Sequence, residues 1–136
     1  MSPTERVTRF CTAVAEWERQ TFAGMTSGKN SVKDCDAARA LLSAIYEDNL
    51  TEKAKGPKKW GMRLAGPVSG NPPQYDQEVT GEEPGPRSSS YVFTKHRTLP
   101  KMLWRYSVVT APGGDPRIDE LRVRAGESTD WKPGMY

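Results

Sequence analysis

The hydrophobic period of the sequence changes once, from a helical repeat in the first half to a strand-like alternation in the second. Apolar residues recur every three or four positions up to about residue 50, and alternate with polar ones after about residue 77. Helices followed by strands, without βαβ alternation, is the order of an α+β domain. We therefore predict one domain over residues 1–136, helical over about 2–56 and sheet-forming over about 77–136.

The chain opens with a full set of helix-start signals. Ser2 offers an N-cap hydroxyl, Pro3 suits the first helical position, and Glu5 is placed to close a capping box. The apolar stripe that follows predicts an amphipathic helix of about five turns. The stripe consists of Val7, Phe10, Cys11, Val14, Trp17 and Phe22.

A second amphipathic pattern follows a loop-like stretch at residues 24–33. Asp34 or Asp36 can cap this helix, and Thr51 can cap a further helix of only about one turn. The predicted buried stripe of the second helix consists of Ala38, Leu41, Leu42, Ile45 and Tyr46.

Four segments have the composition of β-strands, and the last two form a predicted hairpin around the glycines that follow Pro112. The segments are residues 77–83, 89–97, 101–111 and 116–124. Alternation places Trp104 and Tyr106 on one face of the third segment. The odd spacing of Ile118 and Leu121 predicts a β-bulge or a bend, which a strongly curved sheet requires.

The sequence favours a cytoplasmic protein with a small core. No stretch approaches the roughly 20 apolar residues that cross a bilayer, and the first residues lack the order of a secretory signal. Mean hydropathy is low, at −0.74. Cys11 and Cys35 have no CxxC spacing, so we expect buried free thiols, with a disulfide or metal site as the alternative.

Few side chains could carry catalysis or bind a nucleic acid. His96 is the single histidine, which excludes a metal site built on several imidazoles, and we expect it to be a partly exposed strand-end residue. We expect a solvated loop at the lysine cluster formed by Lys53, Lys55, Lys58 and Lys59. The other basic residues are dispersed along the chain. We expect no metal, no cofactor, no enzymatic activity and no nucleic-acid partner.

The chain resembles the bacterial immunity proteins of the nuclear-transport-factor-2-like fold, which are antitoxins of polymorphic toxin systems. The resemblance spans nearly the whole chain and departs where a Gly-Gly-Trp turn usually precedes Arg-Ile-Asp, because here Asp115 and Pro116 follow the glycines. It is carried by RVTRFCTAVAEWE, IYEDNLTEKAKG, the Pro-Pro-x-Tyr-Asp element at 72–76, Val92-Phe93-Thr94, Trp104 to Val109, Arg117-Ile118-Asp119 and Trp131.

This resemblance implies helices on one side of a curved antiparallel sheet, in a cone-shaped, cystatin-like arrangement. It also implies a function: one-to-one binding of a cognate toxin, from a neighbouring cell or from the cell itself, that occludes the toxin's active site. The net charge of +3 favours a neutral or acidic partner. The predicted partner contacts are Tyr75, Asp76, His96, Arg97, Arg105 and Trp131, although Tyr75 and Trp131 could instead seal the open end of the cone.

Two other functions stay open at this point. The same fold hosts isomerases and dehydratases, for which Asp119 or His96 would act with Tyr75 or Tyr106 in an apolar pocket. A deep pocket with an inward carboxylate would favour that enzyme, whereas a cone filled by side chains would favour a binder. The third function is a nonenzymatic subunit or homodimeric scaffold.

Overall fold

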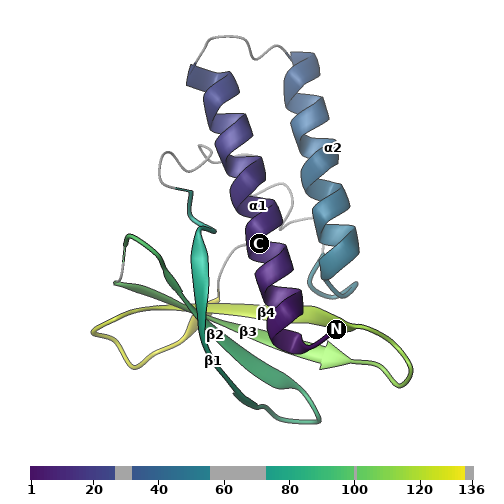
Figure 1. Cartoon of the computed structure of the whole chain (residues 1–136), viewed down its shortest axis with the longest axis vertical. Coiled ribbons are helices and arrows are strands. Elements are labelled where there is room, and N and C mark those ends of the chain that lie inside the picture. The colour runs from purple at the N-terminus through teal and green to yellow at the C-terminus, as the bar shows by residue number, and fades with distance from the viewer. Residues whose placement is uncertain (27–31, 56–72, 100, 134–136) are drawn as a thin grey trace.

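The computed structural model describes residues 1–26, 32–55, 73–99 and 101–133. Within these residues, two helices pack on one side of a five-stranded antiparallel sheet (Figure 1). The chain is therefore an α+β protein, as the order of periods predicted.

Helix α1 (Pro3–Thr26) begins where the capping signals placed it. The backbone N–H of Glu5 donates to Ser2 Oγ at 3.1 Å, and the backbone N–H of Ser2 donates to Glu5 Oε1 at 3.0 Å. These two bonds are the capping box. The predicted apolar stripe is buried from Val7 to Trp17. The helix runs further than predicted, because Gly24 lowers helix stability without ending the helix.

Helix α2 (Val32–Asn49) packs against α1, and the indole N–H of Trp17 donates to the carbonyl of Ala38 at 2.7 Å. Leu42 and Tyr46 are buried as predicted. The prediction for Leu41 is wrong, because this side chain is 56% exposed. With α1 as its main neighbour, α2 buries a narrower stripe than a core helix would.

The expected short third helix is a single turn at residues 52–55. Thr51 Oγ1 accepts the backbone N–H of Ala54 at 3.3 Å, so Thr51 does cap this turn. The predicted stop at Gly56-Pro57 lies outside the described residues, as does most of the crossing loop.

The sheet is an antiparallel meander in the order β1-β2-β3-β4-β5. All four predicted strands are confirmed to within two residues at each end, and the short β5 was not predicted. The strands are β1 (Gln77–Pro84), β2 (Ser90–His96), β3 (Met102–Thr110), β4 (Pro116–Ala125) and β5 (Lys132–Pro133). Residues 50 and 51 cover the edge of β4 near Ile118, where Leu50 and Ile118 form an isolated bridge.

The predicted hairpin and bulge between β3 and β4 are both present. Gly113 has φ +73°, and the N–H of Gly114 donates to the Ala111 carbonyl at 2.9 Å, as in a type II turn. The departure at Asp115-Pro116 leaves the hairpin intact, since Thr110 pairs with Pro116. The register shifts between Ser107 and Val108, so the extra residue is Asp119. Ile118 and Leu121 thereby both face the core.

The core lies between α1 and the strands. Phe10 sits at its centre, with ring centroids 5.7 Å from Tyr75 and 6.3 Å from both Tyr46 and Tyr106. A buried arginine, Arg6, ties three parts of the chain together. Its Nε donates to the Pro116 carbonyl at 2.7 Å, and its terminal nitrogen donates to Asp48 O and Asn49 Oδ1, each at 2.9 Å.

Candidate functional site

The two faces of the sheet differ because α1 packs on one of them and no described helix covers the other (Figure 1). Successive side chains of a strand point to opposite faces, so the register identifies the uncovered side. We call this side the open face. Its members on the central strands are Tyr91, Phe93, Lys95, Leu103, Arg105, Ser107, Glu120, Arg122 and Arg124.

Three aromatic rings and two arginines gather on the open face. The ring centroid of Trp131 lies 6.1 Å from that of Phe93. The guanidinium carbon of Arg105 is 4.4 Å from the ring centre of Tyr91 and 5.1 Å from that of Trp131. The guanidinium carbon of Arg124 is 4.7 Å from the Trp131 ring centre. These are cation–π distances. We call Tyr91, Phe93, Arg105, Arg124 and Trp131 the arginine–aromatic surface.

Both arginines of this surface contact rings, but neither has an acidic partner within the described residues. The Nε atoms of Arg105 and Arg124 are buried and have no hydrogen-bond partner there. Arg122, which pairs across the strands with Arg105, differs because its Nε contacts Glu120. A buried polar group without a partner costs about 1–3 kcal/mol. Two guanidinium charges therefore stay unneutralised at the centre of the open face.

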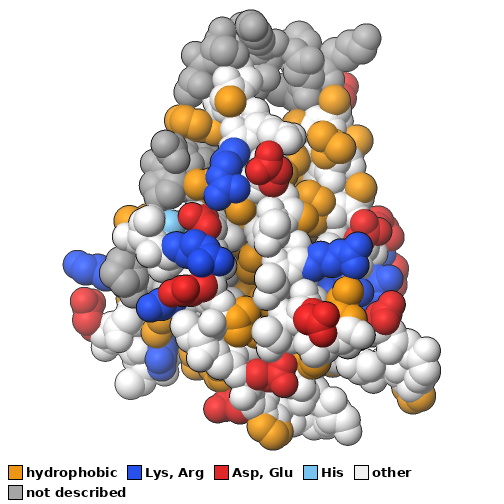
Figure 2. All heavy atoms as spheres, viewed as in Figure 1, with side chains coloured by type: hydrophobic (Ala, Val, Ile, Leu, Met, Phe, Trp, Pro, Cys, Tyr) orange, Lys and Arg blue, Asp and Glu red, His pale blue; other side chains and the backbone are white. Residues whose placement is uncertain are grey.

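A network of ion pairs borders the open face at the ends of β1 and β2. Asp76 lies 3.2 Å from Arg97 Nε and 3.9 Å from Arg19. Arg97 also approaches Glu78 at 3.7 Å, and Glu78 pairs with Lys95 at 3.3 Å. Basic and acidic side chains are accordingly interleaved on this side of the molecule (Figure 2). Asp76 and Arg97, two predicted contacts, thus lie at the rim of the open face.

The predicted contact His96 is 2% exposed, so the expectation of a partly exposed histidine is wrong. Its Nδ1 accepts the backbone N–H groups of Thr98 at 3.1 Å and Leu99 at 3.0 Å. Its Nε2 is 2.7 Å from the Pro73 carbonyl oxygen, which can only accept. These bonds define the Nε2-protonated tautomer. His96 holds the chain on both sides of the rim in place and offers no surface to a partner in this conformation.

The predicted contact Tyr75 is also buried, at 1% exposure, with its ring edge-on to Phe10. The segment that carries it is held by Glu18, a fully buried carboxylate. Glu18 accepts the backbone N–H of Gln74 at 2.8 Å and that of Tyr75 at 3.0 Å. Tyr75 and His96 thus support the rim residues Asp76 and Arg97 from behind.

The covered face contains a buried polar network centred on Gln77. Gln77 Oε1 accepts the hydroxyls of Thr94 at 2.6 Å and Tyr106 at 2.7 Å, and the Tyr106 hydroxyl is 3.3 Å from Cys11 Sγ. Burial raises the pKa of the Cys11 thiol from 9.0 to about 12, and burial also raises the pKa of Tyr106. Cys11 is a free, buried thiol as predicted, and the side chain of Cys35 lies outside the described residues.

The residues weighed for an isomerase or dehydratase lie in different parts of the described structure. Tyr75, His96 and Tyr106 are packed in the interior. Asp119 is the bulged residue of β4, where it accepts the Thr51 hydroxyl at 2.8 Å and lies 3.4 Å from Lys53. The described core combines the aromatic rings around Phe10 with buried aliphatic side chains.

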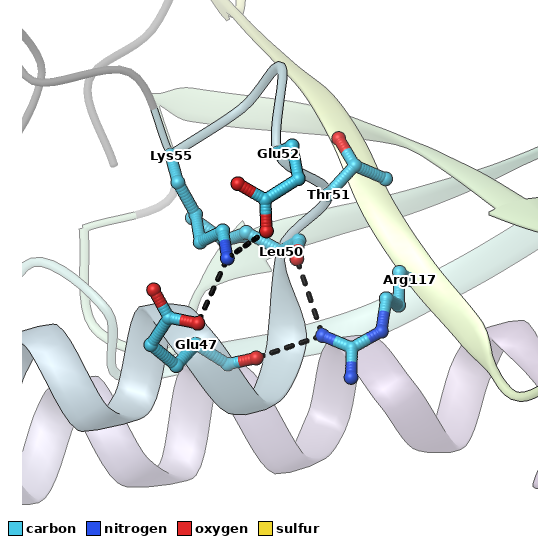
Figure 3. Close-up of a pocket in the computed structure, with 6 residues that line it drawn as sticks. All are labelled: Glu47, Leu50, Thr51, Glu52, Lys55 and Arg117. Carbon is cyan, nitrogen blue, oxygen red and sulfur yellow. Dashed lines mark hydrogen bonds and ion pairs between the residues drawn. The ribbon is translucent and has the colours of Figure 1, made fainter.

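A pocket of about 340 Å³ opens beside the end of α2 and the start of β4 (Figure 3). Lys55 points into it and contacts Glu52 and, at 2.8 Å, Glu47; these hydrogen bonds raise the pKa of the lysine. Arg117 donates to the carbonyls of Glu47 at 2.7 Å and Leu50 at 3.2 Å. The lysine of the pocket is therefore paired with two carboxylates, and Arg117 is held by two backbone carbonyls. The side chain of Lys55 is only 8% exposed, so its assignment to a solvated loop is wrong.

Sequence reasoning missed three members of the arginine–aromatic surface: Tyr91, Phe93 and Arg124. Tyr91 and Phe93 share the parity of a strand face, but their position opposite Arg105 depends on the pairing of β2 with β3. The strand register, which a single sequence does not fix, was the missing information. Arg105 and Trp131 were predicted, and the structure brings these two side chains together.

Comparison of the chain with protein-family models, curated protein sequences and solved structures gives no match. Neither of the described helices is long and apolar enough to span a membrane. The described residues contain no group of three or more His, Cys, Asp or Glu that could hold a metal ion.

Proposed function

We propose that this chain is an immunity protein that binds a cognate bacterial toxin one-to-one through the open face and occludes the toxin's active site. The observation that carries this proposal is the arginine–aromatic surface. Tyr, Trp and Arg dominate the energetic hot spots of protein interfaces, and hot spots lie at the centre of an interface within a polar rim. Here Arg105 and Trp131 lie at the centre, and Asp76 and Arg97 lie at the rim.

The size of the open face is compatible with such a complex. A stable protein interface buries about 800 Å² on each partner. That area is about a tenth of the 7988 Å² surface of this chain, which one face of the sheet and its rim can supply. The unpaired guanidinium groups supply the binding energy that area alone does not.

The finer fold assignment belongs to this proposal. A helix pair on one side of a twisted, bulged antiparallel sheet is compatible with the nuclear-transport-factor-2-like or cystatin-like arrangement. In this proposal the protein acts in the cytoplasm of the cell that carries it, without a cofactor. The open face of the sheet is the binding surface in this proposal, and the core supports its shape.

Co-expression with the product of the neighbouring reading frame tests the function. We expect restored growth and a one-to-one complex, measured by size-exclusion chromatography with light scattering. Trp131→Ala should abolish rescue, whereas Leu41→Ala, which removes a large exposed side chain from α2, should preserve it. Persistent toxicity beside a folded wild-type chain would contradict the proposal. A chain that forms only a homodimer would support the scaffold alternative.

A further inference from the structure

We infer that the arginine–aromatic surface binds a carboxylate-bearing segment of a protein partner, with Arg105 and Arg124 each receiving an Asp or Glu side chain. This inference rests on the proposed function, because it concerns the chemistry of the protein that the open face binds. It is carried by two guanidinium groups that are stacked on rings and have buried Nε atoms without acceptors in the described residues.

The rings fix the planes of both guanidinium groups before a partner arrives. Arg105 lies over Tyr91 and near Trp131, and Arg124 lies over Trp131. Because the Nε sides are buried, the terminal nitrogens are the part of each fork that a partner can reach. A carboxylate matches the guanidinium fork in a planar, bidentate geometry. A pre-ordered arginine therefore loses little conformational freedom when it binds an acid.

The charge of the open face selects an anionic partner. Arg122 is paired with Glu120, and Lys95 is paired with Glu78. Arg105 and Arg124 have no such acid among the described residues. An acidic side chain of the partner would supply the missing charge at the centre, and the paired residues around it would exclude water.

The same contacts argue against a single-stranded nucleic acid as the ligand. Bases stack on aromatic faces that are free. Here the Tyr91 ring is covered by Arg105, and two guanidinium carbons lie within 5.1 Å of the Trp131 ring centre. Glu83 also pairs across the strands with Tyr91 and places a negative charge at the margin. The rings therefore support arginines, and they leave little face for bases.

The register predicts the spacing of the carboxylates. Arg105 pairs with Arg122, so Arg124 is its diagonal neighbour on the adjacent strand. Diagonal neighbours on one face are about 7–8 Å apart. Alternate residues of an extended segment are about 7 Å apart and point to the same side. We therefore expect the partner to present Asp or Glu at two alternate positions of an extended segment.

The first experiment uses the complex with the toxin. Arg105→Gln and Arg124→Gln should each weaken binding by at least about tenfold in calorimetry, and the salt dependence of binding should fall. Arg9→Gln is the matched control, because it removes the same charge from the exposed side of α1. Arg105→Lys keeps the charge without the planar fork and should weaken binding by an intermediate factor. Thermal melts verify that each variant is folded.

The second experiment does not depend on the toxin. The full chain is titrated with a short acetylated Ala/Ser peptide that carries glutamate at two alternate positions, with its glutamine analogue, and with oligothymidylate of similar length. We expect the arginine Nε–H resonances of Arg105 and Arg124 to shift saturably with the glutamate peptide alone in nitrogen-15 NMR spectra.

The outcomes separate the two proposals. A toxin complex that tolerates both glutamine variants would overturn the carboxylate inference and leave the proposed function standing. If no toxin complex forms, the proposed function fails and the peptide titration decides the inference. Tighter binding of oligothymidylate than of the glutamate peptide would overturn the inference in favour of a nucleic-acid surface.

Discussion

The arginines on the two faces of the sheet differ in their hydrogen bonding. On the covered side Arg6 is buried with three acceptors, namely the carbonyls of Pro116 and Asp48 and the side chain of Asn49. On the open side Arg105 and Arg124 are stacked on rings and have no acceptor among the described residues. Folding accounts for the first arrangement, because the hydrogen bonds of this buried guanidinium join three parts of the chain. It does not account for the second.

The comparison extends to the other polar groups. The covered face pairs the hydroxyls of Thr94 and Tyr106 with a single acceptor, Gln77 Oε1. Buried polar groups are usually satisfied in this way. The open face keeps two Nε donors without partners beside half-buried aromatic rings. Unpaired donors are costly in a free monomer, and arginines and aromatic rings are useful in an interface. The covered face thus stabilises the fold, and the open face is the one for which we propose binding.

The largest expected effect compares phenylalanines on the two faces. Phe10→Ala should lower the free energy of unfolding by about 3–5 kcal/mol, because it opens a cavity among three buried tyrosines. Phe93→Ala on the open face should cost less than about 1.5 kcal/mol. Urea denaturation of both variants measures the difference. Equal losses would mean that the open face is a second core.

The polar network of the covered face gives the next effect. Gln77→Met removes the acceptor of Thr94 and Tyr106, and should destabilise by about 1–3 kcal/mol, because the Thr94 hydroxyl loses its acceptor and the Tyr106 hydroxyl keeps only the weak contact with the Cys11 thiol. Adding Thr94→Val and Tyr106→Phe should recover most of this loss in the same denaturation experiment. If the single and triple variants are equally unstable, packing rather than hydrogen bonding is the cause.

Cys11 predicts a pH dependence that belongs to the covered face. Its folded pKa of about 12 exceeds the ordinary 9.0, so between these values the unfolded chain has released a proton that the folded chain keeps. Stability is therefore fully present below pH 9 and falls as pH rises toward 12, by at most about 1.4 kcal/mol per pH unit. Urea midpoints of wild type and Cys11→Ala across this range measure the slope. Identical slopes would contradict the prediction.

The smallest expected effect is on the open face. Arg105→Met should change stability by less than about 1 kcal/mol, since the lost cation–π contacts are offset by removal of a buried donor without a partner. The same variant should still lose binding in the toxin complex. A loss of stability as large as that of Phe10→Ala would show that Arg105 serves folding, and the contrast between the faces would no longer hold.

Most of the fold was readable from the sequence because its signals are local. The capping box at Ser2 and Glu5, the turn at Gly113 and the bulge near Asp119 each depend on residues a few positions apart. Local signals also placed both ends of four strands within two residues. The candidate site was readable in part: Arg105 and Trp131 were found by residue type, whereas Arg124, Tyr91 and Phe93 were not.

The remaining errors concern the burial of individual side chains. Leu41 was expected to be buried and is 56% exposed. Lys55 was expected in a solvated loop, and its side chain is only 8% exposed. His96 is buried because the Pro73 carbonyl and two backbone N–H groups meet its ring. Those contacts join segments that are distant in sequence or that bend back after a strand ends.

The sequence by itself therefore determined the order and type of the two helices and the four long strands, because helix and strand periods arise from neighbours along the chain. Only the tertiary structure decided which side of the sheet is uncovered and which side chains meet there. Arg105, Arg124 and Trp131 come together through the register of β3 with β4 and the return of the chain after β4. Burial and hydrogen bonding depend on such distant contacts, which separate the bonded Arg6 from the two arginines stacked on rings.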